Sequence, residues 1–153
     1  MRKLYNDARA IFGLRGFSLQ AVSTEIISQT MYNPGGVLSL VNGGVKGRIL
    51  AINHNPYRRW TSTTYRQNCG VPLTIIVTYQ VVTTDPQRAG PTTYATQLFA
   101  LYTKEGRPNP MNLRQHHTSN LVELVKDHQA RGEWIIIAGD MNKVLGAKAG
   151  GMT

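Results

Sequence analysis

Short runs of alternating hydrophobic and polar residues dominate the first half of the chain. Three of them, at 35–42, 47–53 and 59–66, follow the break NPGG and are bounded by the turn-forming stretches NGG, NHNP and QNCG. Links of this length suit hairpins and are too short for the helical crossovers that parallel strands need. The pattern therefore predicts an antiparallel meander of three strands.

Two later segments have the character of buried strands. Residues 72–79 read PLTIIVTY and residues 133–142 read EWIIIAGDMN, so each is more continuously apolar than the earlier segments and then turns abruptly polar. Such runs are typical of strands that are covered on both faces. Between them, apolar residues recur at helical spacing over 111–132, which predicts a long amphipathic helix that closes at Gly132.

The order of strand, helix and strand has a consequence for the placement of polar groups. A crossover helix would make the two strands parallel, with their carboxyl ends on the same edge of the sheet. That edge is where open α/β sheets gather their ligands. Helical spacing at 5–16 and 92–106 predicts two further helices. The whole pattern predicts a single domain of the α/β (α+β) class, with a mixed sheet and flanking helices.

Charge is the unusual feature of the composition. The 153-residue chain has a net charge of +9 and a pI near 10.1, which suggests an anionic partner such as nucleic acid, a phosphate-rich substrate or an acidic membrane surface. A basic surface kept only for solubility is the alternative. Residues 26–84 contain no acidic side chain, and the cations among them could track a nucleic-acid backbone beside Trp60 or Tyr57, or form a solvated strand face. These cations are Lys46, Arg48, Arg58, Arg59 and Arg66.

The cysteine, histidine and hydropathy patterns limit the kinds of site and the cellular location that we expect. Cys69 is the only cysteine, which excludes an intrachain disulfide and a zinc site built on cysteines. His116 and His117 are adjacent and point to different helix faces, which predicts a partly exposed pair and disfavours a shared metal site. No apolar run approaches the ~20 residues that cross a bilayer, and the first ten residues lack the apolar stretch of a signal peptide. We therefore expect an intracellular protein, nuclear or cytoplasmic, without a membrane partner.

The end of the 133–142 segment holds the residues best suited to chemistry. Asp140 and Asn142 follow Gly139, which lets the backbone approach a ligand closely. A carboxylate here could orient or deprotonate a water, and an amide could donate to a phosphate oxygen. The plainer alternative is an Asx turn at the end of a strand. Tyr79, at the end of the other apolar strand, is most simply an aromatic cap on the core.

Five motifs follow one another in a specific order. They are a Gly-Gly strand (GGVLSLVN), a strand similar to "GRW" (RRWTSTTYR), a strand ending in Tyr (LTIIVTY), a long helix with a basic N-terminal half, and WIIIAGDMN. This order, over about 35–142, resembles the endonuclease/exonuclease/phosphatase superfamily, the DNase I-like proteins. GPTT and a helix-containing insertion after the Tyr strand resemble the endonucleases of mobile elements such as non-LTR retrotransposons.

The resemblance implies a fold, an activity and a site. The fold would be a DNase I-like β-sandwich, and the activity would be hydrolysis of phosphodiesters in DNA. Asp140 would orient the attacking water, Asn142 would support the scissile phosphate, and Tyr79 would contact phosphate. In such enzymes Mg²⁺ or Mn²⁺ screens the phosphate charge while water attacks in line.

Several parts of the family pattern are missing. Glu25 lies too close to the Gly-Gly strand to be the family's metal-binding glutamate, and the upstream Asn and the downstream Asp and Asp-His pair are absent. One carboxylate leaves a hard divalent cation short of oxygen ligands. We therefore expect an incomplete metal-dependent nuclease of retroelement type, with apolar faces and sheet edges left open. The alternatives are a non-catalytic, basic nucleic-acid-binding remnant and a chain that does not fold stably.

Overall fold

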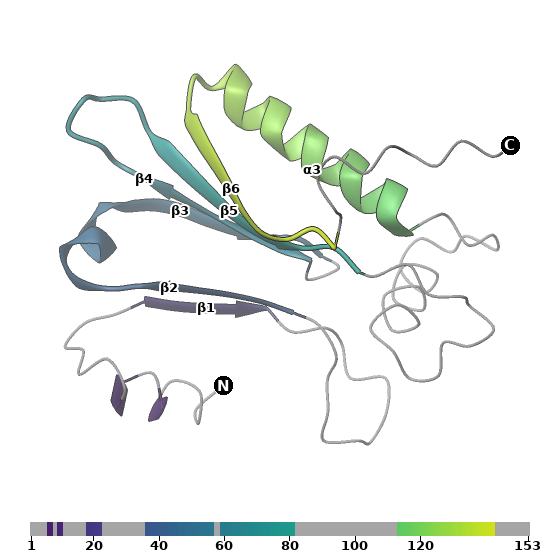
Figure 1. Cartoon of the computed structure of the whole chain (residues 1–153). Helices are drawn as coiled ribbons and strands as arrows, with labels where there is room; N and C mark the ends of the chain where they lie inside the picture. The colour runs from purple at the N-terminus through teal and green to yellow at the C-terminus, as the bar shows by residue number, and fades with distance from the viewer. Residues whose placement is uncertain are drawn as a thin grey trace, which may run out of the picture.

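Two β-sheets and one long helix make up the described part of the chain (Figure 1). The computed structural model describes residues 6–7, 9–10, 18–22, 36–56, 59–81 and 113–142. A two-stranded sheet has the order β1-β2, and a four-stranded sheet has the order β3-β4-β5-β6. The elements in chain order are β1 (Ser18–Val22), β2 (Val37–Val41), the 3-10 helix η1 (Gly43–Arg48), β3 (Ile49–His54), β4 (Trp60–Tyr65), β5 (Leu73–Tyr79), α3 (Leu113–Ala130) and β6 (Trp134–Asp140).

The four-stranded sheet is mixed. Antiparallel pairs join β3 to β4 and β4 to β5, whereas β5 and β6 are parallel. The parallel register runs from Leu73 beside Trp134 to Tyr79 beside Asp140. This arrangement confirms the α+β class with a mixed sheet, and it confirms that the strands at 72–79 and 133–142 end at the same edge.

The long helix predicted over 111–132 is α3, and its C-terminus has the expected stop. Glu133 N donates to His128 O at 3.2 Å, and Gly132 N donates to Gln129 O at 2.9 Å. Gly132 has a φ of 70°, the left-handed conformation. These are the two hydrogen bonds of a Schellman motif, which satisfies the last carbonyls of a helix. α3 runs along one face of the four-stranded sheet before the chain enters β6 (Figure 1).

The two-stranded sheet lies on the other face, and its pairing differs from the predicted meander (Figure 1). The strand predicted at 35–42 is β2, but it pairs with β1 and not with the next strand along the chain. The reason is the link that follows it. Residues 43–48 form η1, which begins at Gly43 with a φ of 64°, so the chain leaves one sheet and enters the other instead of folding back.

The core of the four-stranded sheet is carried by β4 and β5. All six residues of β4 are buried, and along β5 buried residues alternate with half-buried ones. Thr74, Ile76 and Thr78 are the buried set, and Thr78 faces α3 through a hydrogen bond to His117. β5 is an inner strand of this sheet, because it lies between β4 and β6.

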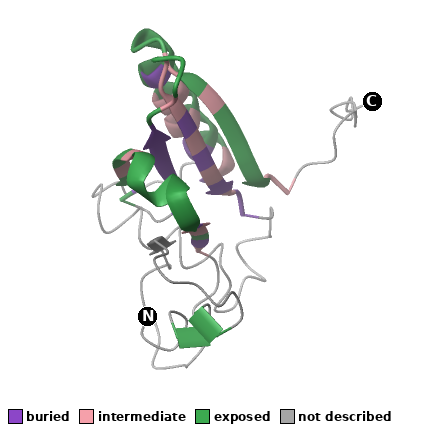
Figure 2. Cartoon of the chain, turned by 90° about the vertical axis from the view of Figure 1, so that its left-hand side faces the viewer, coloured by how far each residue is buried: buried purple, intermediate pink, exposed green. Residues whose placement is uncertain are grey.

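β6 forms an exposed edge of the same sheet (Figure 2). Trp134, Ile136 and Ile137 are 55%, 49% and 43% exposed. The prediction that 133–142 is covered on both faces is therefore wrong. Within the part of the chain that the structure describes, no strand pairs with the outer edge of β6. Among the described residues, the outer edge of β6 is therefore unpaired, and three large apolar side chains are exposed along it.

The two other predicted helices fall wholly or mostly outside the described residues. Of 5–16, only residues 6, 7, 9 and 10 are described, and these four are helical. The helix predicted at 92–106 lies entirely outside. In the ranges that are described, no helix combines the length and apolar character that a membrane crossing requires.

Candidate functional site

The carboxyl ends of β5 and β6 bring Tyr79 and Asp140 side by side. The two residues are register partners, and partners in adjacent strands place their side chains on the same face of the sheet. Tyr79 is half-buried and Asp140 is exposed. The structure therefore joins two of the predicted site residues at the edge where ligands of such sheets bind.

Gly139 brings the two strands unusually close at this edge. Its φ is 144°, a conformation that residues with a side chain rarely adopt. A Cβ at this position would lie 1.8 Å from Thr78 O and 2.9 Å from Thr78 N. Only glycine allows the backbone of β6 to approach β5 so closely. The close approach expected at this glycine is thus to the neighbouring strand.

Asp140 and Asn142 form the turn that ends β6. Asn142 N donates to Asp140 Oδ1 at 2.8 Å, and Asn142 has a left-handed φ of 44°. The side-chain amide of Asn142 donates to Gln80 O. This is the Asx turn that stood as the alternative to a catalytic role. The amide that the family resemblance assigns to a phosphate is occupied by a backbone carbonyl, whereas the Asp140 side chain stays exposed.

Arg114 ties the same edge together, a role that the sequence analysis missed. Its guanidinium donates to Val81 O at 3.2 Å, to Gln80 Oε1 at 3.1 Å and to Asn142 O at 3.2 Å. A cation in the first turn of a helix lies at the positive end of the helix dipole and needs compensating partners. That mismatch was a signal in the sequence, because an arginine in the first turn of a long helix indicates acceptors elsewhere.

The described residues at this edge do not make a divalent-cation site. Among them, no group of three or more His, Cys, Asp or Glu side chains is arranged to hold a metal ion. Mg²⁺ requires several oxygen ligands in near-octahedral geometry. Asp140 offers one carboxylate, and its described neighbour Asn142 has its amide engaged. The Mg²⁺ or Mn²⁺ implied by the resemblance therefore does not fit this part of the chain.

Arg59 lies in the interior, so its predicted role in nucleic-acid binding is wrong. The residue is 1% exposed, which leaves no surface for a phosphate to reach. Its guanidinium donates to Leu113 O at 3.1 Å and to His116 Nδ1 at 2.7 Å. Arg59 thus joins the start of β4 to the first turn of α3. The sequence alone does not distinguish an arginine that packs against a distant helix from one that faces water.

The adjacent histidines are buried as well, against the prediction of a partly exposed pair. His116 is 9% and His117 is 2% exposed, and His117 Nε2 lies 3.1 Å from Thr78 Oγ1. Burial, and then the positive charges of Arg59, His116 and Arg114, lower the pKa of His117 to about 4. The imidazole is therefore neutral at pH 7 and bridges α3 to β5.

A second polar network lies at the opposite end of the sheet. Glu133, 8% exposed, accepts hydrogen bonds from Thr74 Oγ1 and from Arg131 Nε, and it pairs with His128 Nδ1 at 2.7 Å. Burial raises the pKa of Glu133, but the hydrogen bonds from Thr74, Arg131 and His128 outweigh burial and lower the pKa to about 2. Since Thr74 Oγ1 also lies 2.7 Å from Thr64 Oγ1, one ionised carboxylate links the end of α3 to β5 and β4.

Three of the five predicted nucleic-acid-binding cations gather at this opposite end. Lys46 and Arg48 belong to η1, and Arg66 follows β4 with its backbone N donating to Arg48 O at 2.7 Å. All three residues are exposed. Arg58 lies outside the described residues. The length of β5, about 20 Å, separates these cations from Tyr79.

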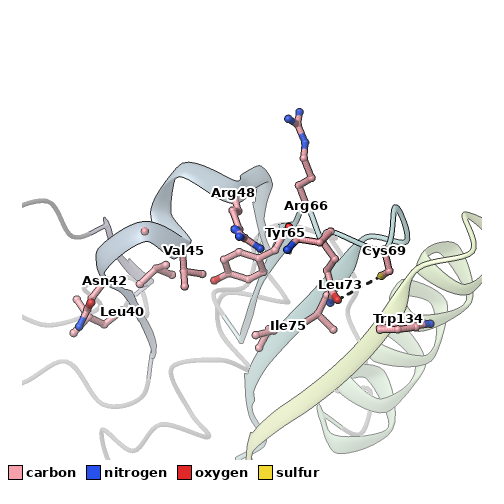
Figure 3. A pocket seen from close by; sticks show the side chains of 14 residues that line it. Leu40, Asn42, Val45, Arg48, Tyr65, Arg66, Cys69, Leu73, Ile75 and Trp134 are labelled. Carbon is pink, nitrogen blue, oxygen red and sulfur yellow. Dashed lines mark hydrogen bonds between the residues drawn. The ribbon is translucent and has the colours of Figure 1, made fainter.

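Two of the cations line a cavity of about 1000 Å³ between the two sheets (Figure 3). Apolar side chains of β2 and β5 form part of its wall, together with the aromatic rings of Tyr65 and Trp134. In Figure 3 Arg48 lies beside Tyr65, whereas Arg66 projects away from the cavity. This cavity could not be predicted from the sequence, because it depends on how the two-stranded sheet packs on the larger one.

Comparison of the chain with models of protein families, with curated proteins and with solved structures gives no match. The function is therefore inferred from the geometry of the chain itself. Tyr79, Asp140 and Asn142, to which the family resemblance assigns catalytic roles, lie at the carboxyl ends of β5 and β6. The exposed cations lie at the other end of the sheet.

Proposed function

We propose that this chain is a nucleic-acid-binding module without a catalytic step, and that it binds through the exposed cations at the η1 end. One observation carries the proposal: Arg48 and Arg66 line a cavity that has no acidic residue in its lining, and Lys46 belongs to the same 3-10 helix as Arg48. Cations placed in this way neutralise phosphates and release the counterions condensed on them. The net charge of +9 adds a long-range attraction for a polyanion.

The opposite end of the sheet supports binding without cleavage. The amide of Asn142 and the guanidinium of Arg114 are engaged by backbone carbonyls of the same edge. Of the three predicted catalytic residues, Tyr79, Asp140 and Asn142, Asp140 is the exposed one. A single carboxylate whose neighbours are hydrogen-bonded to backbone carbonyls is poorly suited to phosphodiester hydrolysis, because catalytic groups act as a unit.

Removal of the cavity-lining cations should weaken binding of a fluorescently labelled single-stranded DNA. We expect the double variant Arg48→Ala, Arg66→Ala to lower the affinity about tenfold in fluorescence anisotropy titrations. Because counterion release scales with the number of phosphates contacted, the slope of log affinity against log salt should fall by about 2. Lys46→Ala should weaken the double variant further.

Lys126→Ala is the matched control, since it removes one positive charge from an exposed position of α3. Its affinity should stay close to that of the unaltered chain, whereas each single variant, Arg48→Ala or Arg66→Ala, should bind more weakly. An equal loss in all of them would mean that only net charge attracts DNA and that the η1 end is not the contact surface. Absence of binding by the unaltered chain at low salt would overturn the proposal.

Cleavage at Asp140 is the second candidate function, favoured by the register that sets an exposed carboxylate beside Tyr79. Its test is nicking of a supercoiled plasmid with Mg²⁺ or Mn²⁺, compared with EDTA and with Asp140→Asn, which keeps an acceptor for Asn142 N. We expect no nicking above the EDTA control. Nicking that requires both the metal and the Asp140 carboxylate would replace the binding proposal with a nuclease.

A further inference from the structure

The cavity between the sheets has a row of side chains suited to a flat ring. Tyr65 is the register partner of Leu73, and Leu73 is the register partner of Trp134, so the three stand side by side across β4, β5 and β6. All three line the cavity. The two aromatic residues are two strand spacings apart, about 10 Å between backbones, with Leu73 as the floor between them.

The exposure of these side chains differs in a way that suits entry from solution. Tyr65 is 7% exposed and forms an inner wall, whereas Trp134 is 55% exposed at the edge of the sheet (Figure 3). A large indole held at a cavity mouth is a stacking platform, because every nucleobase presents a π-face to it. Desolvating this ring against a ligand would also reduce the apolar surface that β6 exposes.

The polar side chains that line the cavity are of the kinds that bind a nucleotide. Asn42, Gln67 and Asn68 line it and bring both donors and acceptors, which the edges of a base require. Arg48 and Arg66 also line it and carry the charge that complements phosphate. No acidic side chain is among the lining residues, so nothing in the lining repels an anion.

We propose that the cavity takes one unstacked base of a single-stranded nucleic acid, stacked on Trp134, while Arg48 and Arg66 hold the flanking phosphates. This inference rests on the proposed nucleic-acid-binding function and adds the position and the kind of contact. A duplex keeps its bases stacked and paired, so the site selects single strands over duplexes of the same length.

Tryptophan fluorescence reads this contact directly, because the chain has only two tryptophans and Trp60 is 9% exposed within β4. Single-stranded DNA should quench the emission of the unaltered chain. Trp134→Ala should abolish the quenching and lower the affinity measured by anisotropy about tenfold, with an unchanged salt slope. Trp60→Phe, the matched control, should keep both the quenching and the affinity.

A thiol reagent gives a second readout that needs no substitution. Cys69 is the only cysteine of the chain, it is exposed, and it lines the same cavity. Single-stranded DNA should slow alkylation of Cys69 by iodoacetamide, and an oligonucleotide of abasic sites should protect it less. Decyl phosphate has an alkyl chain in place of a base. If it protects Cys69 and quenches the tryptophan emission as strongly as a nucleoside monophosphate does, base recognition is overturned in favour of a site for alkyl chains.

The failure of this inference is distinct from the failure of the proposed function. If the chain binds single-stranded DNA but its emission is not quenched and Trp134→Ala leaves the affinity unchanged, the cations bind phosphate and the base does not enter. If Trp134→Phe, which keeps an aromatic ring, binds no more tightly than Trp134→Ala, a stacked ring is not what holds the DNA. If the unaltered chain does not bind DNA at all, the proposed function itself is wrong.

Discussion

Replacement of Gly139 by alanine should lower the free energy of unfolding by about 4 kcal/mol, a large part of the stability of an ordinary domain. Two costs add at this position. The φ of 144° lies where side chains are strained, and the new Cβ would meet the backbone of Thr78 at 1.8 Å. Backbone atoms within a sheet cannot move aside as a flexible side chain can, so β6 would have to separate locally from β5.

Urea denaturation followed by circular dichroism measures the loss, and Gly70→Ala provides the control. Gly70 has a φ of 86°, also in the left-handed region, but a Cβ there would meet nothing within 4 Å. We expect Gly70→Ala to cost about 1 kcal/mol, the price of the backbone conformation alone. Equal losses in the two variants would show that the close approach to Thr78 does not exist in solution.

Acidification should destabilise the fold in two consecutive steps. The pKa of His117 is 6.5 in the unfolded chain and about 4 in the fold, so between these values only the unfolded chain takes up the proton. The contribution of neutral His117 to the free energy of unfolding is present in full above pH 6.5. It falls by on the order of 2 kcal/mol as the pH drops toward 4. Glu133 acts in the same direction in a lower window. Its carboxylate stabilises the fold above pH 4.5, and the contribution is lost as the pH falls toward 2.

Thermal or urea unfolding at half-unit steps from pH 7 to pH 2 tests both steps. His117→Gln, which keeps a donor near Thr78 without a titrating group, should flatten the profile between pH 6.5 and 4 and leave the lower step intact. Glu133→Gln should flatten the lower step and spare the upper one. A profile of the unaltered chain that stays level down to pH 4 would contradict the buried, neutral state of His117.

The elements that the sequence predicts well are those whose signals are local. The helix α3 carries its own stop at Gly132, and β5 contains the apolar run IIV at 75–77. The parallel pairing of β5 with β6 followed from the order of the elements along the chain, because a strand, a helix and a strand have few ways to pack. The carboxyl edge with Tyr79 and Asp140 was located by the same argument.

The errors concern partners that lie far away in the sequence. β2 pairs with β1 because η1 diverts the chain, and the alternation at 18–22 went unrecognised as a strand. Arg59 and His117 are polar residues buried where α3 packs on the sheet, and their hydrogen-bond partners are distant in the chain. Spacing placed Asp140 at the right edge, but it could not choose between a free carboxylate and an Asx turn.

The parallel pairing of β5 with β6 also sets an order of assembly. The β3-β4-β5 hairpins close short loops, and such contacts form early because little chain entropy is lost. β6 can join only after residues 80–133 have been traversed and α3 lies across the sheet. We therefore expect β3, β4 and β5 to pair before β6 does during synthesis, because WIIIAG emerges later. Until β6 joins, the edge of β5 that it covers in the native sheet has unpaired backbone N–H and C=O groups.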